Sequence, residues 1–299
     1  MKEVLVICGA TATGKTALAA ECAKLLDSAV ISADSQLVYK GLDIGTAKPT
    51  KEEMLGVPHY MIDVAGPEAE YSVSDYRDAA LPILNGLIAH GKVPVICGGT
   101  GFYINSLLFD YSYGGVPANE EVRKKYENLA AERGKEYVYD ILKEKDGASA
   151  AKLHPNDLKR VIRALEIAES GLKKSEMNDG NKPRFSYLAV AVDFPREQLY
   201  ARINERVDKM FKAGLIEEVK GLIARGIDEN CRCMQAIGYK EVLKGLKNGY
   251  SQSTMRDIIK QNTRRYAKRQ ITFFKKLPNL VWLPPKEATA ENVLSLLES

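Results

Sequence analysis

The sequence predicts an α/β fold with a parallel sheet core, an inserted helical domain and a helical C-terminal part. Short aliphatic runs of strand length recur along the chain, at residues 3–8, 29–32 and 187–192. A segment with helical spacing separates the first two runs, and this alternation of strand and helix is typical of a parallel sheet. A highly charged stretch without strand signals, from Pro117 to about Gly171, interrupts the series and predicts the insertion.

The remaining elements are predicted from the same two patterns. The strands are β-branched and aliphatic runs, at residues 3–8, 29–32, 93–97, 187–192 and 280–283. The helices have apolar residues at helical spacing, at residues 15–26, 76–90 and most of 195–274, with breaks at Gly214, Gly226 and Gly249. Residues 181–184 are expected to form a loop.

The charged helical stretch sets the expected domain boundaries. We expect an α/β core of residues 1–115 plus 184–299, which includes basic C-terminal helices. The inserted helical domain is expected to contain residues 116–183. Two domains agree with the length of 299 residues, since a domain commonly contains about 150 residues.

Composition excludes several classes of protein. Hydrophobic residues make up 45% and charged residues 27% of the chain, which is ordinary for a globular protein and excludes a wholly disordered one. The longest apolar runs are far too short to span a membrane, and we expect no secretory signal. Five cysteines, an odd number, then predict reduced thiols and a cytoplasmic protein. We expect a monomer and no zinc site.

Positive charge is concentrated near the C-terminal end. Residues 256–276 contain eight lysines and arginines against one acidic residue, Asp257. Such a block can neutralise phosphates of a nucleic acid, because each contact releases counterions. A solvated basic helix face is an equally good interpretation of the charge alone.

Residues 9–16 carry the phosphate-binding motif G-x-x-x-x-G-K-[ST] between the first predicted strand and the first predicted helix. Glycines allow backbone N–H groups to turn towards phosphate oxygens, and the helix N-terminus adds positive potential. We expect Lys15 to reach terminal phosphate oxygens and the Thr16 hydroxyl to ligate Mg²⁺. The core is therefore expected to be of the P-loop NTPase type. The predicted diphosphate-binding residues are Gly9, Ala10, Thr11, Ala12, Thr13, Gly14, Lys15 and Thr16.

The acidic residue that P-loop NTPases use to hold the metal shell is missing from its usual place. The strand at 93–97 ends in two glycines and Thr100 instead of an aspartate. The available acid is Asp34, just past the second predicted strand. It can be a general base acting on an incoming nucleophile, or simply a helix N-cap, and the residues alone leave both open.

Several segments together resemble one family, the tRNA dimethylallyltransferases, also called tRNA isopentenyltransferases. Besides the glycine-rich loop, the segments that carry the resemblance are DSQLVYKG (34–41), DIGTAKP (43–49), GVPH (56–59), GGTGFY (98–103), QAIGYKE (235–241) and TRRYAKRQIT (263–272). They occur in order over nearly the whole chain, and the GTAKP and AKRQIT segments are the most specific. Ala10 and Phe273 stand where family members commonly have proline and tryptophan.

The resemblance implies transfer of a dimethylallyl group from dimethylallyl diphosphate to N6 of adenosine 37, beside the tRNA anticodon. The P-loop would then grip the diphosphate leaving group, with Mg²⁺ on Thr16. By the same resemblance Asp34 accepts the proton of the amine, and Thr11 binds the leaving oxygen. Arg206 is the expected second cation on the diphosphate, with Arg202 as the alternative.

The resemblance also implies a set of residues that bind the tRNA anticodon stem-loop. The target adenosine must leave its stacked loop to reach Asp34. The expected RNA contacts are Asp34, Ser35, Gln36, Leu37, Thr100, Arg123, Lys159, Arg160, Val161, Ile162, Arg163, Gln235, Ala236, Ile237, Gly238, Tyr239, Lys240, Lys268, Arg269, Gln270 and Thr272.

Other interpretations stay open beside these. The arginines of residues 160–163 can pair with Glu166 on a helix surface. Three aromatic residues can belong to the core, namely Tyr39, Phe102 and Tyr103. A P-loop kinase acting on a small molecule or nucleotide is the alternative function, and an RNA-binding protein switched by nucleotide is the third.

Overall fold

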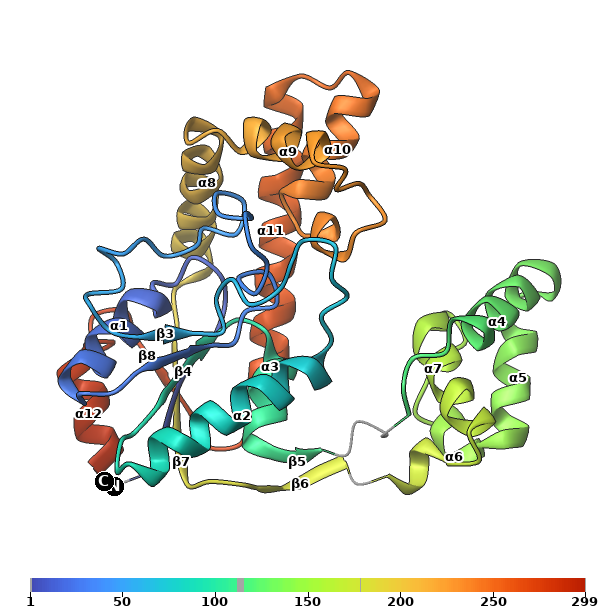
Figure 1. Ribbon diagram of the computed structural model, residues 1–299, viewed down its shortest axis with the longest axis horizontal. Helices are drawn as coiled ribbons and strands as arrows, with labels where there is room; N and C mark the ends of the chain where they lie inside the picture. Colours follow the sequence, from blue (N-terminus) through green and yellow to red (C-terminus); the bar gives the residue numbers. More distant parts are fainter. Residues whose placement is uncertain (1, 112–115, 178, 299) are drawn as a thin grey trace. The chain divides into compact units, whose positions relative to one another are not determined.

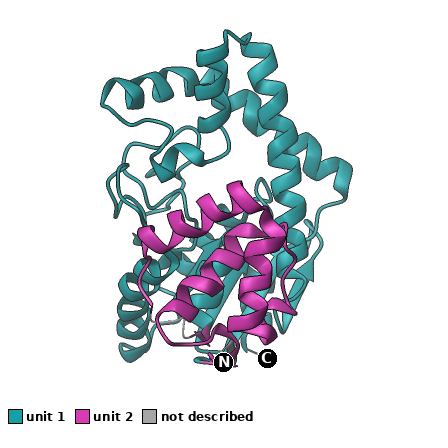
Figure 2. Cartoon of the chain, turned by 90° about the vertical axis from the view of Figure 1, so that its right-hand side faces the viewer, with its two compact units in different colours: residues 1–108, 184–299 teal, residues 109–183 magenta. Residues whose placement is uncertain are grey.

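The computed structural model describes residues 2–111, 116–177 and 179–298. The chain divides into two compact units, shown in Figure 1 by sequence colour and in Figure 2 by unit. Unit 1 contains Met1–Leu108 and Arg184–Ser299, and unit 2 contains Phe109–Pro183. The expected boundary after residue 115 falls on residues 112–115, which lie outside the described residues.

Unit 1 is built on a six-stranded sheet, which confirms the predicted α/β class. The strand order is β3-β2-β4-β1-β7-β8, and the pairings along it are parallel. The strands are β1 Val4–Cys8, β2 Val30–Ser32, β3 His59–Tyr60, β4 Val95–Gly98, β7 Tyr187–Val192 and β8 Leu280–Leu283. Because parallel strands end at the same edge of a sheet, the residues that follow β1, β2 and β4 are brought together there.

Helices surround this sheet and extend beyond it. They are α1 Lys15–Leu25, α2 Val73–Ala89, α3 Gly101–Leu108, α8 Arg196–Lys212, α9 Leu215–Ala224, α10 Tyr239–Asn248, α11 Gln252–Phe274 and α12 Ala290–Glu298, with a short 3-10 turn η2 at Arg232–Gln235. The predicted breaks are confirmed, since Gly214, Gly226 and Gly249 all have positive φ between helices.

The main core lies between one face of the sheet and two helices. Alternate residues of β1, among them Leu5 and Ile7, pack with residues of α1 and with Val293 and Leu297 of α12. All five residues of β1 are buried, as expected for a strand with parallel neighbours on both sides. The strand that leads into the glycine-rich loop is therefore held rigidly.

Unit 2 is mainly helical, as the sequence predicts. It contains α4 Glu120–Arg133, α5 Lys135–Lys145, α6 Gly147–Ala150, α7 Leu158–Glu169 and a 3-10 turn η1 at Lys174–Glu176. The expected loop at residues 181–184 is wrong for residues 181–183, because Asp179–Pro183 form strand β6, which pairs antiparallel with β5, Phe109–Tyr111. The two strands are distant in sequence, so the local pattern of loop-forming residues could not predict their pairing.

A buried aspartate supports the helical part of unit 2. Asp146 is 3% exposed and caps the N-terminus of α6, accepting the N–H groups of Ser149 over 3.0 Å and Ser175 over 3.1 Å. Burial raises the pKa of Asp146, but these hydrogen bonds outweigh it and lower the pKa to about 2. The carboxylate form is therefore part of the folded structure.

Three elements of unit 1 are absent from the sequence prediction, namely β3, α3 and α12. Strand β3 has two residues, too few for any periodicity. Helix α3 begins within the glycine-rich segment after β4, which is a poor helix signal. None of the described helices combines the length and the apolar character that a membrane span requires.

Candidate active site

Residues 9–16 form a tight loop between β1 and α1. The φ angle is positive at Gly9 (125°), Ala12 (65°) and Gly14 (85°), a conformation that glycine adopts without strain. The Thr13 hydroxyl donates a hydrogen bond to the carbonyl oxygen of Ala10 over 2.9 Å. Helix α1 begins directly after Gly14, so the loop closes on a helix N-terminus, which favours an anion.

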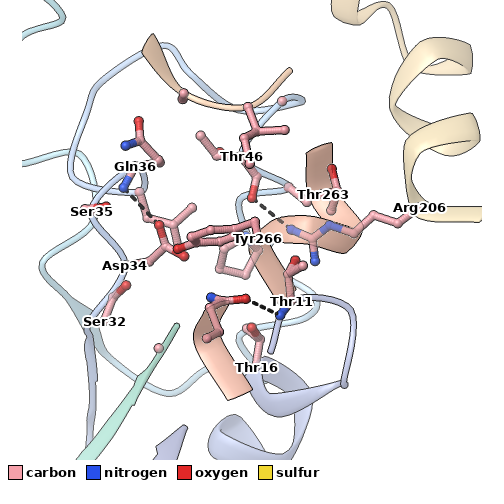
Figure 3. Close-up of a pocket in the computed structure, with 18 of the residues that line it drawn as sticks. Thr11, Thr16, Ser32, Asp34, Ser35, Gln36, Thr46, Arg206, Thr263 and Tyr266 are labelled. Atoms are coloured by element: carbon pink, nitrogen blue, oxygen red, sulfur yellow. Dashed lines mark hydrogen bonds between the residues drawn. The ribbon is translucent and has the colours of Figure 1, made fainter. Parts of the chain in front are cut away.

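A cavity of about 330 Å³ lies beside this loop (Figure 3). Its walls come from the loop, the turn after β2, the segment of residues 43–49 (the wall segment), and helices α8 and α11. The polar residues that line it include Thr11, Lys15, Thr16, Ser32, Asp34, Ser35, Gln36, Thr46, His59, Arg206, Gln235, Lys240, Thr263, Tyr266, Arg269 and Gln270. The apolar ones include Leu37, Pro49, Ile62, Val207, Met210, Ala236, Ile237 and Ile259.

Two cations, Lys15 of α1 and Arg206 of α8, line this cavity. The Lys15 ammonium donates to the carbonyl oxygen of Ala10 over 3.2 Å, and Nη2 of Arg206 donates to the carbonyl oxygen of Thr46 over 3.0 Å. Burial is the main cause that lowers the pKa of both side chains, and Asp34 acts against it. An anion bound between Lys15 and Arg206 would stabilise both positive charges.

Asp34 follows β2 and lies in a turn rather than at a helix. Its Oδ1 accepts the N–H of Gln36 over 2.9 Å, and the N–H of Ser35 donates to Oγ1 of Thr100 over 3.0 Å. Residues 35–38 are turns, so the helix N-cap interpretation of Asp34 is wrong. Figure 3 shows the carboxylate directed into the pocket towards Tyr266. Burial and then Asp34 raise the pKa of Tyr266, which keeps its hydroxyl protonated.

The wall segment is held by one carboxylate of α9. Oε2 of Glu218 accepts the N–H groups of Asp43 over 2.9 Å and Ile44 over 2.8 Å. Oε1 accepts the N–H of Gly45 over 3.0 Å and the hydroxyl of Tyr239 over 2.6 Å. A Cβ at Gly45 would lie 2.4 Å from the Tyr239 ring, so only glycine fits there. Glu218 thus fixes the backbone whose Thr46 carbonyl meets Arg206.

The end of β4 and the turn after it are too crowded for side chains at residues 98 and 99. A Cβ at Gly98 would lie 2.1 Å from the backbone oxygen of Ala33, and a Cβ at Gly99 would lie 2.2 Å from Nε2 of Gln270. P-loop NTPases commonly place their metal-binding aspartate near this point. The close packing explains why glycines stand here instead.

Many of the predicted site residues meet in the cavity. Those that line it are Thr11, Lys15, Thr16, Asp34, Ser35, Gln36, Leu37, Arg206, Gln235, Ala236, Ile237, Lys240, Arg269 and Gln270. The predicted residues of unit 1 that lie outside this lining are Gly9, Ala10, Ala12, Thr13, Gly14, Thr100, Gly238, Tyr239, Lys268 and Thr272. The remaining ones, Arg123, Lys159, Arg160, Val161, Ile162 and Arg163, belong to unit 2.

Three of the expected RNA contacts are wrong for their side chains. Val161 and Ile162 are 0% and 4% exposed in the apolar core of unit 2, on the buried face of α7. Tyr239 is 0% exposed and donates its hydroxyl to Glu218. The resemblance implied RNA contacts for whole segments, but the helical period turns these side chains inward.

The three arginines of unit 2 that were expected to contact RNA are engaged in ion pairs. Nη1 of Arg163 lies 2.5 Å from Oε2 of Glu166, and Nε of Arg123 lies 3.1 Å from Oε1 of the same carboxylate. Arg160 pairs with Asp157 over 3.1 Å. The pairing with Glu166 is therefore confirmed for Arg163 and wrong for Arg160, and Glu166 itself is buried rather than on the helix surface.

The structure separates the two candidate arginines of α8. Arg206 lines the cavity, whereas Arg202 donates from Nε to the carbonyl oxygen of Ala12 over 2.8 Å and stacks on Phe194. Among the aromatics left open, Tyr39 and Tyr103 are buried core residues, at 1% and 4% exposure.

Several lining residues are missing from the sequence prediction. Val207 and Met210 lie three positions apart on α8, a spacing that predicts one helix face but not a cavity. Thr46 lies in the GTAKP segment, which carried the resemblance without an assigned role. Tyr266 of α11 also lies in the cavity. The GTAKP segment was the one signal that could have found part of this wall.

Comparisons with known proteins agree with the motifs. The family model of IPP transferases matches residues 37–277, and that of isopentenyl transferases matches residues 2–70. A tRNA dimethylallyltransferase of Acetivibrio thermocellus is 44% identical over 291 residues, which cover 96% of this chain and 93% of that protein.

Solved structures of similar proteins agree with these sequence matches. A tRNA isopentenylpyrophosphate transferase of Bacillus halodurans has a TM-score of 0.72 at 40% identity, covering 99% of this chain and 94% of that one. A eukaryotic dimethylallyltransferase acting on tRNA has a TM-score of 0.81 at 29% identity, covering 97% of this chain and 74% of that one. The kinase alternative is not favoured by any of these matches. The resemblance carried by the motifs is confirmed, and the chain belongs to the tRNA dimethylallyltransferase family.

Proposed function

We propose that this protein transfers a dimethylallyl group from dimethylallyl diphosphate to N6 of adenosine 37 in tRNA and releases diphosphate. The observation that carries the proposal is one cavity in which Lys15, Arg206 and Asp34 meet beside the glycine-rich loop of a tRNA dimethylallyltransferase family member. Two cations suit the diphosphate, and a carboxylate suits the amine that replaces it.

The diphosphate end of the donor is bound by the loop side of the cavity. Lys15 and Arg206 neutralise the charge that grows on the leaving oxygens as the allylic C–O bond breaks and its electron pair goes to diphosphate. The hydroxyl of Thr11 donates a hydrogen bond to the leaving oxygen. This assignment is supported by the buried surroundings of the two cations, which make an anion a favourable neighbour.

The oxygen donors of the cavity fit Mg²⁺ bound together with diphosphate. Mg²⁺ commonly takes one or two protein oxygens, substrate phosphate oxygens and waters. The Thr16 hydroxyl lines the cavity and supplies an oxygen of this kind. When bound, the ion would act as a Lewis acid that withdraws charge from the leaving diphosphate.

The five-carbon group fits the apolar wall of the same cavity. The aliphatic residues of the lining include Val207 and Met210 of α8, Ile237 before α10 and Ile259 of α11. Such a wall excludes water from the allylic carbon, which favours attack by the amine over hydrolysis.

Asp34 accepts the proton that the adenine amine loses as the new C–N bond forms. The amine lone pair is delocalised into the purine ring, so proton removal in the transition state makes it a better nucleophile. The bond from Gln36 to Oδ1 fixes the orientation of the carboxylate in the cavity. The adenosine must be flipped out of its loop to reach this carboxylate.

The tRNA is held by exposed cations in and beside the cavity. Arg269 of α11 and Lys240 of α10 are exposed and line the cavity, and Lys268 of α11 is exposed next to Arg269. Lys159 and Arg160 are exposed on α7 of unit 2 and are proposed as contacts to the anticodon loop. Phosphate contacts of this kind position the RNA without reading its sequence.

Mass analysis of nucleosides tests the proposal directly. The purified protein is incubated with Mg²⁺, dimethylallyl diphosphate and an unmodified tRNA, and adenosine carrying one added C5H8 unit is expected. The Asp34→Asn protein is the matched control. A parallel incubation with ATP and no prenyl donor tests the kinase alternative. Phosphorylated product without prenylated adenosine would overturn the proposal.

A further inference from the structure

Helix α11 carries a buried glutamine on the side that faces the glycine-rich loop. Gln270 is 5% exposed, and its Oε1 accepts the N–H of Thr11 over 2.9 Å, a bond drawn at Thr11 in Figure 3. Its Nε2 donates to the carbonyl oxygen of Gly99 over 2.9 Å. One amide therefore joins two loops that are far apart in the sequence, and both of its ends are used.

The site is shaped for this amide. Gly99 leaves the space that Nε2 occupies, since a Cβ there would lie 2.2 Å from that atom. Ala267, one turn earlier on α11, is 0% exposed and packs with Ala10 of the glycine-rich loop. The helix thus contacts the loop through both an apolar residue and a hydrogen bond.

The opposite face of the same helix is exposed and basic. Arg265, Lys268, Arg269 and Thr272 are exposed at the i, i+3, i+4 and i+7 positions of one face, whereas Gln270 belongs to the other. A helix is stiff over this length, so a shift imposed on the basic face also moves Gln270 relative to the loop.

We propose that Gln270 is a positioning residue that couples RNA bound on the basic face of α11 to the diphosphate grip of the glycine-rich loop. It does so by fixing the backbone at Thr11, whose hydroxyl then faces the leaving oxygen, and by fixing the turn at Gly99. This positioning role takes the place of the direct contact with RNA that was expected for Gln270. The inference rests on the proposed function, since it assumes that RNA and diphosphate occupy these surfaces.

Coupling between two ligands is reciprocal and can be measured at equilibrium. Inorganic diphosphate with Mg²⁺ is titrated into the full chain by calorimetry, with and without an unmodified anticodon stem-loop RNA. RNA should tighten diphosphate binding to the wild-type protein. In Gln270→Met, which keeps the side-chain length but loses both hydrogen bonds, diphosphate affinity without RNA should fall about fivefold, as the loss of about 1 kcal/mol predicts. The tightening by RNA should largely disappear, while RNA affinity itself is retained.

A second variant distinguishes the effects of the two hydrogen bonds and also controls for a folding defect. Gln270→Glu keeps an acceptor for Thr11 but cannot donate to Gly99, so its coupling should lie between those of wild type and Gln270→Met. Kinetically, both variants should raise KM for dimethylallyl diphosphate. A purely structural role would instead lower kcat at unchanged KM, through loss of folded enzyme. The control is Tyr187→Phe, which removes a hydroxyl that donates to the carbonyl oxygen of Pro278 over 3.0 Å.

The outcomes distinguish this inference from the proposed function. Wild-type protein that binds no diphosphate contradicts the proposed function itself. Wild-type protein that binds diphosphate equally well with and without RNA overturns only the coupling. Variants that keep full coupling, or that lose RNA affinity while diphosphate binding is unchanged, overturn the role of Gln270.

Discussion

Replacing Glu218 by glutamine should release the wall segment without removing a large side chain. Each carboxylate oxygen accepts two hydrogen bonds, Oε2 from Asp43 and Ile44, and Oε1 from Gly45 and Tyr239. If Oε2 becomes the NH₂ group, two backbone N–H donors face a donor; if Oε1 does, the N–H of Gly45 faces a donor and the Tyr239 hydroxyl must turn to accept. Two bonds to a charged group are worth about 3–6 kcal/mol, and water recovers part of this at the exposed Asp43, so we expect a loss of about 2–4 kcal/mol.

Amide hydrogen exchange measures this loss where it occurs. If the wall segment opens locally, exchange protection of the Ile44 and Gly45 amides should fall about 30- to 1,000-fold, which corresponds to 1.4 kcal/mol per tenfold. KM for dimethylallyl diphosphate should rise, because the Thr46 carbonyl no longer holds Arg206. The control is Glu217→Gln, the same charge change at the exposed neighbouring position. Equal protection in the two variants would refute the assigned role of Glu218.

Three further changes test other parts of the structure. Asp34→Asn should lower kcat at least about 100-fold with tRNA affinity retained, and a prenylation rate close to wild type would remove Asp34 from the mechanism. Lys268→Ala should weaken RNA binding most at low salt and reduce the slope of the logarithm of the RNA-binding constant against the logarithm of the salt concentration by about one unit. An unchanged slope in filter-binding titrations would mean that Lys268 is a solvated surface residue that does not contact RNA. In unit 2 the pKa of Asp146 is lowered from 3.8 to about 2, so it stabilises the fold above pH 3.8 and this contribution is lost as pH falls through 2. Asp146→Asn should therefore cost about 2 kcal/mol at pH 7 and nothing near pH 1, a difference that hydrogen exchange of the unit 2 core can detect.

The sheet and the loop were predictable because their signals are local. The run that forms β1, the glycines of the loop and the spacing of α1 stand next to one another in the chain. The carboxyl end of β2 then places Asp34 beside the loop by the geometry of parallel strands alone. In the same way the three glycines of the C-terminal part marked the helix ends.

The contacts that hold the site were not predictable, because they join distant residues. The Thr11 amide and the Gln270 side chain are 259 positions apart, and Glu218 is 175 positions from Asp43. No spacing rule connects such pairs. The predicted RNA contacts of Val161 and Ile162 were wrong for another reason. The resemblance implied the whole segment of residues 159–163, although the 3.6-residue period directs these two side chains into the core.

The crowded end of β4 limits which other activities this fold can acquire by substitution. An aspartate at residue 98 or 99, the single change that would begin to imitate a nucleotide hydrolase, would collide with the backbone of Ala33 or with Gln270. Conversion to ATP hydrolysis would therefore need several simultaneous replacements across three segments of the chain. The tight fit that assembles the pocket also isolates the protein, in evolutionary terms, from the much larger group of enzymes with which it shares its glycine-rich loop.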